Sequence, residues 1–480
     1  MHFFQKLLGQ LGVFFSLFIL LLSIACSKDD GPNTFKADAK YLTIFHVNDM
    51  HGQLNNFAKI KHIVDAARLE TNVLVVSGGD IFSGNAIVDQ YSEKGYPIID
   101  VMNQVGFDVT VIGNHEFDYG QTILADRFEQ ADFEWVCANV EAGSSNDLPQ
   151  PDPYVTLDVG DVTITVLGLV ETSGREDVVP LTHPWKVLDL SFEYYYDIVG
   201  QYSGLKKQEE ADVYLALTHL GRNSDLNLAN NYPFFDVIIG GHTNHLTTEA
   251  VNGIPTLMAG KYLSHLGRID LTIENQKVVD FEATLIDLEN YSESDATLSA
   301  AIQEYNNAPQ FAEVIGFANT HHSKNELGCF YTTALKEYMQ TDVSFQNGGG
   351  IRAEIDQGDI TALEIYNMDP FNNGSVIFTW TAREIKDFFI ETGTGLHVSG
   401  ITFEHDGNDL IIRDDQGMVV DDASELTIGI NDFIPATNTN YFIFEEADGK
   451  ELTTAETVIE YLKTINSTLD YEGCNHYFQY

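Results

Sequence analysis

Residues 109–118 read VTVIGNHEFD, a short apolar run that ends in a polar turn. The run is nearly continuous in aliphatic residues, which is expected of a strand that is covered on both faces. The turn carries Asn114, His115 and Asp118, whose side chains are of the types that bind metal ions or move protons. The stretch therefore predicts an α/β fold in which the polar ends of buried strands carry the chemistry.

The same pairing of an apolar run with a polar turn recurs through the first part of the chain. The predicted strands are residues 41–47, 73–76, 109–112, 164–170, 213–217 and 235–239, with helices predicted at 57–69 and 98–105. Five of the six runs end in Asp, His or Asn beside glycines, at residues 48–52, 78–80, 113–118, 218–221 and 240–245. One such turn alone would be an ordinary loop. Five together predict a ligand-binding edge, because the carboxyl ends of strands in an open α/β sheet meet there.

The residue types at this edge suit a pair of divalent ions. Imidazole nitrogens favour zinc, manganese or iron, and carboxylate and amide oxygens complete mixed ligand shells. Two ions roughly 3.5–4 Å apart clamp the attacking and leaving oxygens during phosphate-ester hydrolysis. One carboxylate has to bridge the ions, and Asp80 is the natural candidate because its strand contributes a single type of ligand.

The motif order D-x-H, G-D, G-N-H-E, T-H-L-G and G-H-x-N resembles that of the calcineurin-like metallophosphoesterases. Over about residues 41–450 the chain resembles the two-domain 5′-nucleotidases, a family that includes UDP-sugar hydrolases. The resemblance implies an α/β fold with a metallophosphoesterase β-sandwich flanked by helices, followed by a C-terminal α+β substrate-binding domain. It implies two metal sites, one held by Asp49, His51, Asp80 and Asn244 and the other by Asp80, Asn114, His219 and His242. His245 follows Asn244 and is left out of both sites.

His115 and Asp118 are the predicted catalytic pair. His115 follows the predicted ligand Asn114 directly, and Asp118 lies three residues further on, where a carboxylate can orient and charge the imidazole. The family resemblance assigns the pair the same role. A water activated by the two metal ions is expected to attack phosphorus, so that no protein nucleophile is needed.

The second domain is expected to bind the substrate. Asn347 and Arg352 flank a glycine turn, whose backbone amides and guanidinium group suit phosphate or carboxylate oxygens. A tight turn beside a surface Arg is the alternative interpretation. The resemblance makes both residues substrate contacts, and it places a nucleobase between the rings of Phe371 and Phe433.

Two departures from the family pattern affect this pocket. Residues 434–440 read IPATNTN, where family members carry G-G-D-G with an Asp that contacts the ribose. The helix before Asn347 offers Lys336 and Tyr338 in place of an expected Arg. The alternatives are therefore phosphodiesters or pyrophosphates as substrates, such as 2′,3′-cyclic nucleotides, UDP-sugars or NAD, and a surface binding protein without catalysis.

Residues 1–25 have the three-part layout of a secretory signal. Lys6 precedes a long apolar run, and Cys26 stands where a lipoprotein signal places the residue that becomes lipidated. A permanent membrane span is the alternative interpretation. We therefore expect an exported lipoprotein at the outer membrane, the cell surface or the periplasmic face, which touches the membrane only through its lipid anchor.

The expected domains are a metallophosphoesterase domain at residues 41–290, a linker at 291–310 and a substrate-binding domain at 311–480. Residues 292–295 read SESD, a helix start within the linker. The second domain has a predicted helix at 382–391 and strand-like runs at 410–413 and 441–444. The acidic stretches at 406–407 and 414–417 are predicted to be hairpin turns, and calcium binding is the alternative interpretation for them. Cys137, Cys329 and Cys474 are expected to be buried, or two of them to be paired.

The chain has 480 residues, and its 72 acidic and 25 basic residues give a net charge of −47. This charge opposes nucleic-acid polymers and anionic membranes as partners. A small phosphorylated substrate, expected to be a nucleotide, is compatible because two divalent ions and Arg352 would neutralise the cleft locally. The sequence thus predicts an exported phosphohydrolase with two divalent ions, zinc or manganese, that releases phosphate from 5′-nucleotides.

Overall fold

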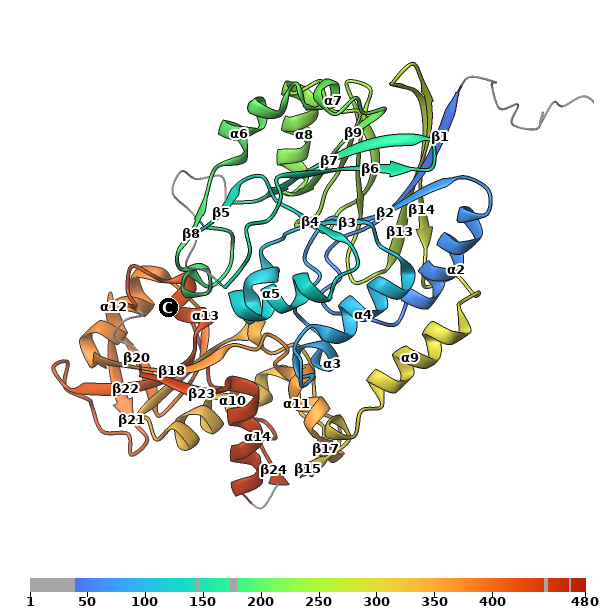
Figure 1. Ribbon diagram of the computed structural model, residues 1–480. Coiled ribbons are helices and arrows are strands. Elements are labelled where there is room, and N and C mark those ends of the chain that lie inside the picture. The colour runs from blue at the N-terminus through green and yellow to red at the C-terminus, as the bar shows by residue number, and fades with distance from the viewer. Residues whose placement is uncertain (1–38, 144–146, 173–178, 444–447, 466–467) are drawn as a thin grey trace, which may run out of the picture. The chain divides into compact units, whose positions relative to one another are not determined.

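The computed structural model describes residues 39–143, 147–172, 179–443, 448–465 and 468–480. The predicted signal sequence and Cys26 lie outside these residues. Residues 40–480 form one compact unit (Figure 1). Among the described residues, no helix has the length and apolar character needed to cross a membrane.

Two six-stranded sheets pack face to face in the first part of the chain (Figure 1). In spatial order the first sheet contains β14 (Lys277–Asp287), β13 (His265–Glu274), β1 (Lys40–Val47), β2 (Asn72–Ser77), β3 (Val109–Val111) and β4 (Glu134–Val136). The second contains β11 (Leu246–Val251), β12 (Ile254–Ala259), β10 (Val237–Ile239), β9 (Val213–His219), β7 (Val162–Val170) and β6 (Tyr154–Val159). A small separate sheet pairs β5 (Val140–Ala142) with β8 (Leu190–Phe192).

Strand β1 shows why the apolar runs form strands. Leu42 and Ile44 point into the core between the two sheets, whereas Phe45 and Val47 pack against the helices on the outer face. Both faces of the strand are therefore buried, which requires a continuous apolar run rather than an alternating one. All six predicted runs coincide with strands, although β3 ends one residue earlier than predicted, at Val111, and β10 begins two residues later, at Val237.

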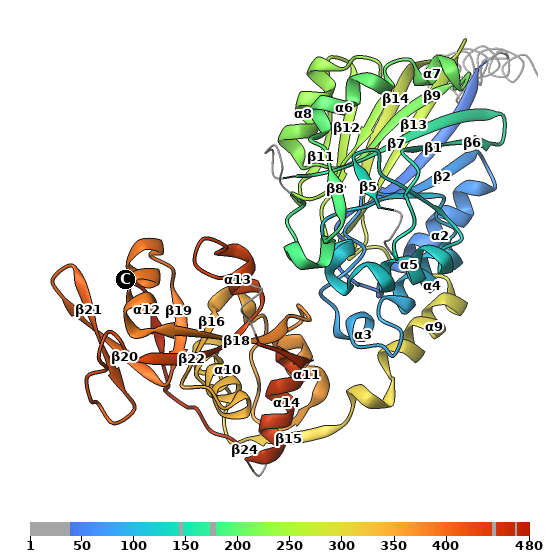
Figure 2. The same cartoon turned by 60° about the vertical axis from the view of Figure 1, so that its left-hand side comes forward.

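Helices cover both outer faces of the sandwich (Figures 1 and 2). On one side lie α2 (Phe57–Arg68), α3 (Ala86–Asp89), α4 (Tyr96–Val105), α5 (Gln121–Gln130) and α9 (Ala296–Asn306). On the other side lie α6 (Tyr195–Ile198), α7 (Leu205–Gln208) and α8 (Arg222–Asn231). The predicted β-sandwich flanked by helices is thus confirmed. The predicted linker contains α9, and the side chain of Asp295 caps its first turn by accepting a hydrogen bond from Leu298 N at 2.7 Å.

The last part of the chain forms three further sheets and their helices. The largest sheet has the order β23 (Asp448–Thr453), β18 (Gly374–Thr381), β22 (Glu425–Asn431), β16 (Val343–Asn347), β19 (Leu396–Ser399) and β25 (Tyr477–Phe478). The others are β17 (Gly358–Thr361), β15 (Val314–Ala318) and β24 (Thr468–Leu469), and the hairpin of β20 (Ile401–Asp406) with β21 (Asp409–Asp414). The helices are α10 (Lys324–Met339), α11 (Ala362–Met368), α12 (Ala382–Thr392), α13 (Phe433–Thr437) and α14 (Thr454–Thr464).

One predicted strand of this part is wrong. Residues 441–443 form no strand, and Phe444 lies outside the described residues. Phe442 is buried and stacks on Trp380 with 4.3 Å between ring centroids. The apolar run therefore reflects packing of a loop onto the core rather than a place in a sheet. The predicted turn at 406–407 does join a hairpin, that of β20 and β21.

Candidate metal centre

Polar side chains gather at the carboxyl ends of adjacent parallel strands. Strand β2 pairs in parallel with both β1 and β3, and β9 pairs in parallel with both β7 and β10. The predicted ligands lie at the end of five of these strands or shortly after it: Asp49 and His51 after β1, Asp80 after β2, Asn114 after β3, His219 as the last residue of β9, and His242 and Asn244 after β10. The structure thus delivers them from both sheets.

Asp80 is the common member of two groups of metal-binding side chains. One group contains Asp80 with His51 and His115, and the other contains Asp80 with His219 and His242. Within each group the candidate ligand atoms all lie within 4.8 Å of one another. The Oδ2 atom of Asp80 lies 3.0 Å from His219 Nε2 and 4.0 Å from His51 Nε2. Asp80 is therefore the residue that the two groups share.

The remaining predicted ligands reach this cluster to different degrees. His242 donates its backbone N–H to Asp49 Oδ2 at 3.0 Å, and its Nδ1 lies 3.0 Å from Asn114 Oδ1. Asn244 is exposed. His245 is exposed too, and its Nδ1 lies 3.1 Å from Thr243 Oγ1 rather than in either group of ligands.

The histidine tautomers leave a place for cations. His219 Nδ1 lies 2.7 Å from the backbone oxygen of Gly78, and His51 Nδ1 lies 3.0 Å from that of Ser83. A carbonyl oxygen only accepts hydrogen bonds, so each Nδ1 must carry a proton, and Nε2 is the nitrogen of each ring that is left to bind a cation. Metal-binding histidines are oriented in this way, by donating their other N–H to a carbonyl. Both Nε2 atoms face the carboxylate of Asp80.

Buried atoms without partners point to the same conclusion. Among the described residues, Asp49 Oδ1 is buried without a hydrogen bond, and the buried His219 Nε2 has Asp80 Oδ2, 3.0 Å away, as its neighbour. Burial lowers the pKa of His219, but the adjacent Asp80 carboxylate outweighs burial and raises it to about 10. The cluster thus favours positive charge at the nitrogen that faces Asp80. Nitrogen, carboxylate and amide donors around such a point fit divalent transition-metal ions.

The predicted catalytic pair is assembled beside these ligands. His115 Nδ1 lies 2.7 Å from Asp118 Oδ2, and Ser83 donates its hydroxyl to the same oxygen at 2.6 Å. Burial lowers the pKa of His115, but the carboxylates of Asp118 and Asp80 outweigh it and raise the pKa to about 10. The side chain of His115 is 32% exposed, against 11% for Asp118. Asp118 therefore fixes one side of the charged His115 imidazole, and the other side can face a ligand.

The predicted substrate residues lie around the end of β16. Asn347 is the last residue of this strand, and its Oδ1 accepts a hydrogen bond from Asn431 Nδ2 at 3.0 Å. Arg352 is exposed, with its guanidinium carbon 5.5 Å from the ring centre of Phe371. Phe433 begins α13 and is 42% exposed. In the described part of the chain, the rings of Phe371 and Phe433 do not contact each other.

Comparison with protein families identifies both parts of the chain. The model of the calcineurin-like phosphoesterases matches residues 42–245, and the model of the 5′-nucleotidase C-terminal domain matches residues 307–446. The chain belongs to the two-domain 5′-nucleotidase family. The sequence-based family prediction is confirmed, and the calcineurin-like phosphoesterase fold implies divalent metal ions.

Individual relatives agree with this assignment. The trifunctional nucleotide phosphoesterase protein YfkN of Bacillus subtilis is 28% identical over 499 aligned residues, which cover 88% of this chain and 34% of YfkN. Protein UshA of Yersinia enterocolitica is 25% identical, over 82% of this chain and 86% of UshA. The solved 5′-nucleotidase precursor from Thermus thermophilus has a TM-score of 0.70 at 22% identity, and the match covers 91% of this chain and 98% of that one. The chain thus spans about a third of YfkN and most of the other two proteins.

The backbone of this nucleotidase-family member is strained at the ligands. Positive φ angles occur at Asp49 (50°), His51 (48°), Asp80 (53°), His242 (75°) and Asn244 (57°). Such angles cost free energy in residues other than glycine, and they persist at functional sites where the surroundings enforce them. Here the loops bind one another, because Asp49 N donates to Gly79 O and His51 N donates to Asp80 O, each at 3.0 Å.

Glu116 is a residue of the site whose role the sequence did not reveal. Its buried carboxylate accepts backbone hydrogen bonds from Ile81 N at 2.6 Å, Gly113 N at 2.7 Å and Asp80 N at 3.1 Å. It therefore ties the loop after β3 to the loop after β2. The only signal was its place in the G-N-H-E motif.

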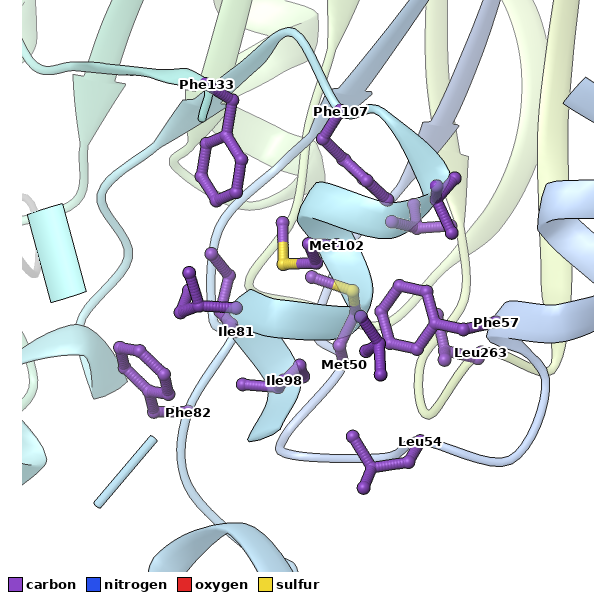
Figure 3. Close-up of a cluster of buried hydrophobic side chains, with 14 of the residues drawn as sticks. Met50, Leu54, Phe57, Ile81, Phe82, Ile98, Met102, Phe107, Phe133 and Leu263 are labelled. Carbon is purple, nitrogen blue, oxygen red and sulfur yellow. The ribbon is translucent and has the colours of Figure 1, made fainter. Parts of the chain in front are cut away.

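Apolar residues between the ligands anchor the same loops. Met50 stands between Asp49 and His51, Ile81 follows Asp80, and both are fully buried in the cluster that Figure 3 shows. Glycine is needed where these loops approach each other closely: a Cβ atom on Gly113 would collide with Asp80 Oδ1. Side chains that alternate between core and site thus hold the ligands in place.

Proposed function

We propose that this chain is a phosphohydrolase with two divalent metal ions that releases phosphate from 5′-nucleotides. The observation that carries the proposal is the Asp80 carboxylate, which belongs to both ligand groups and faces the Nε2 atoms of two imidazole rings. The donor atoms suit zinc or manganese. Bound ions of this kind would supply neutralisation of phosphoryl charge and a water molecule of lowered pKa.

We assign each metal a set of ligands around the shared Asp80. Asp49, His51 and Asn244 would complete one site, and Asn114, His219 and His242 the other. Support comes from the orientation of the His51 and His219 rings and from the unpartnered Oδ1 of Asp49.

His115 would present a charged N–H to the phosphoryl group. Its Nδ1 is occupied by Asp118, so Nε2 carries the proton that can bind a phosphoryl oxygen or protonate the leaving group. Ser83 and the ammonium group of Lys186 also bind Asp118, through its side chain and its backbone oxygen respectively. Asp118 therefore orients His115 and does not itself need to touch the substrate.

Substrate binding would fall to the region around β16. Arg352 offers an exposed guanidinium fork that matches phosphate oxygens, and Asn347 lies at the start of the same turn. Phe371 and Phe433 are placed on separate elements, so a planar base could enter between them. These four residues are the proposed substrate contacts.

One observation favours a wider range of substrates as a second candidate function. Phe433 opens the short helix α13, and residues 434–440 contain no acidic side chain for a ribose hydroxyl. A pocket without this contact depends less on an intact ribose. Cyclic nucleotides, UDP-sugars and NAD are therefore included as candidate substrates.

The location and the domain division belong to the same proposal. We infer export as a lipoprotein from residues 1–26, and domains at 41–290 and 311–480 joined by residues 291–310. In support of the division, no sheet of the described residues mixes strands from before and after the proposed linker.

A phosphate-release panel tests the function. The full chain, loaded with zinc, manganese or magnesium, would be incubated with AMP, UDP-glucose, NAD, 2′,3′-cyclic AMP and glucose 6-phosphate, with a coupled nucleotidase step for products that retain phosphate. We expect turnover of AMP in zinc or manganese that EDTA abolishes. Turnover of the diesters alone would support the second candidate, and no turnover of any ester by a protein with bound metal would refute both.

A further inference from the structure

We propose that the C-terminal strap, residues 471–480, positions the glycine turn, residues 347–352, for substrate binding, and that the disulfide between Cys329 and Cys474 holds the strap in place. The inference rests on the proposed role of the glycine turn in substrate binding. Nothing in the family match covers the strap, because the matched residues end at 446.

The strap extends the sheet that ends in the glycine turn. Strand β25 pairs with β19 through His397 with Tyr477 and Leu396 with Phe478. On its other edge, β19 pairs with β16 through Leu396 with Asn347. Leu396 therefore lies between Phe478 of the strap and Asn347, the first residue of the turn.

The ring of Tyr477 lies next to the turn itself. It packs edge-on against His397, with 5.3 Å between ring centroids. A Cβ atom built on Gly348 would lie 3.9 Å from the Tyr477 ring and 3.8 Å from His397 Nε2. These two rings thus line the side of Gly348 on which a side chain would stand, and loss of either ring would leave that side of the turn open.

The strap is short and needs an anchor. Its strand has two residues and Tyr477 is 45% exposed, so the strap has few buried contacts of its own to hold it in place. The stacking of Phe478 on Phe403, with 4.3 Å between centroids, and the hydrogen bond from Gln479 to Gly393 O at 3.0 Å hold its far end.

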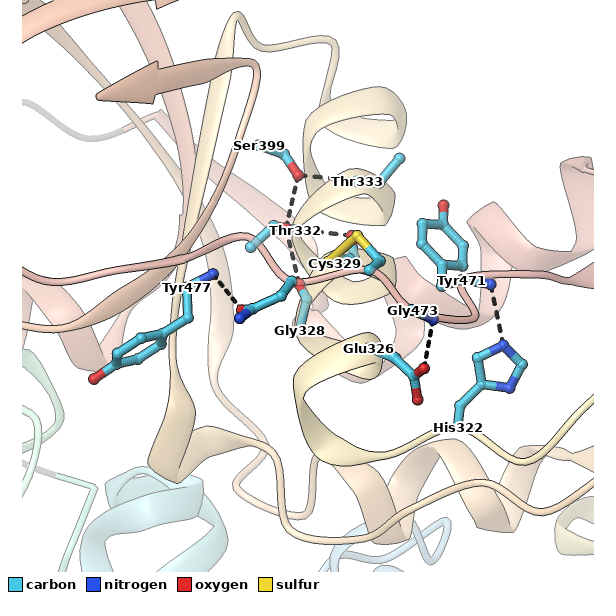
Figure 4. Close-up of a disulfide and its surroundings, with 12 residues drawn as sticks. His322, Glu326, Gly328, Cys329, Thr332, Thr333, Ser399, Tyr471, Gly473 and Tyr477 are labelled. Carbon is cyan, nitrogen blue, oxygen red and sulfur yellow. Dashed lines mark hydrogen bonds between the residues drawn. A yellow bond between two sulfur atoms is a disulfide. The ribbon is translucent and has the colours of Figure 1, made fainter. Parts of the chain in front are cut away.

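The disulfide supplies the anchor at the near end (Figure 4). It joins Cys474 to Cys329 on α10, and Glu326 of the same helix accepts a hydrogen bond from Gly473 N at 2.6 Å. Helix α10 is itself fixed to β19 through Thr332 and Ser399, whose hydroxyl groups lie 2.8 Å apart. The strap is therefore attached to α10 through the disulfide and to β19 through β25, and α10 is attached to β19.

Reduction of the disulfide is the first test. Dithiothreitol converts Cys329 and Cys474 to two thiols and is itself oxidised to its cyclic disulfide. We expect the KM for AMP to rise about tenfold with little change in kcat, because a small displacement of a positioning group has effects of this size or larger. The Cys474→Ser variant should show the raised KM without reductant. Cys137→Ala is the matched control: Cys137 is a free buried thiol, so this variant should respond to dithiothreitol as the wild type does.

Substitutions of Tyr477 test whether the strap positions the glycine turn or only stabilises the fold. Tyr477→Ala should raise the KM, whereas Tyr477→Phe keeps the ring and should restore it. Tyr480→Ala removes a strap ring whose contact is with His405, and should leave the KM unchanged. Zinc content should stay constant throughout. A KM that is unaffected by reduction and by Tyr477→Ala would overturn the proposal, as would a parallel loss of kcat and metal.

Hydrogen exchange tests this inference independently of the proposed function, because it does not require enzymatic activity. The amide of Ile351 donates to Gly348 O at 3.3 Å and that of Arg352 donates to Met368 O at 2.8 Å. Hydrogen exchange at these amides should quicken in Cys474→Ser and Tyr477→Ala but not in Tyr477→Phe. Unchanged exchange would overturn the inference even in an active enzyme, whereas faster exchange in a chain that hydrolyses no ester would refute only the proposed function.

Discussion

The metal centre and the glycine turn differ in how firmly the structure holds their side chains. Asp80 and His219 are buried, and each is fixed by backbone groups of other loops. Arg352 and Phe433 are exposed, and within the described part of the chain the guanidinium group of Arg352 donates one long hydrogen bond, to Gly349 O at 3.4 Å. A buried charged cluster tolerates few changes, whereas an exposed recognition surface can change one contact at a time. This difference explains why the departures from the family pattern lie in the second region.

The largest effect is expected from Asp80→Ala. Loss of the shared carboxylate should empty at least one metal site and reduce phosphate release by about three orders of magnitude, the upper range for removal of one stabilising group. Metal content by mass spectrometry of the purified protein and initial rates with AMP would be measured together. Asp158→Ala, at an exposed acidic residue of β6, is the control. Two bound metals per chain in Asp80→Ala would contradict the bridging role.

A substitution in the predicted catalytic pair, His115 and Asp118, should reduce turnover without removing metal ions. His115→Ala should keep both metals and lose turnover by roughly 10²- to 10³-fold, which is the usual contribution of general acid–base catalysis. His245→Ala is the matched control, since His245 is exposed near the same edge but outside both ligand groups. Metal loss in His115→Ala would instead place His115 among the ligands.

The glycine turn should respond in KM rather than in metal content. Arg352→Ala is expected to raise the KM for AMP about tenfold or more, because a hydrogen bond to a charged group contributes about 1.5–3 kcal/mol. Arg413→Ala removes an Arg that binds Glu404 on the β20–β21 hairpin, and serves as the control. An unchanged KM in Arg352→Ala would show that the turn does not bind the phosphate.

The smallest effect concerns the charge of −47. Negative charge at the surface should slow the approach of an anionic nucleotide until salt screens it, which occurs over a Debye length of about 10 Å at 0.1 M. We expect the apparent KM for AMP to fall roughly twofold as sodium chloride rises through this range. A KM that stays flat or climbs would mean that the acidic residues lie away from the approach path.

The metal centre and the region around the glycine turn also differ in how much of their structure could be predicted from the sequence. The place of the predicted metal ligands at the sheet edge could be predicted because each follows an apolar run, and the runs coincide with strands. The role of Glu116 was not, since its carboxylate turns back to bind amides of residues that precede it by 35 and 36 positions. The pairing of Cys329 with Cys474, 145 residues apart, and the strand at Tyr477–Phe478 depend on tertiary packing that no local pattern encodes.

Anomalous diffraction from crystals of the full chain grown with zinc would test the central claim most directly. We predict two strong peaks roughly 3.5–4 Å apart, one on each side of the Asp80 carboxylate, with His51 at one peak and His219 at the other. A single peak, or two peaks of which neither touches Asp80, would contradict a two-metal centre bridged by this residue.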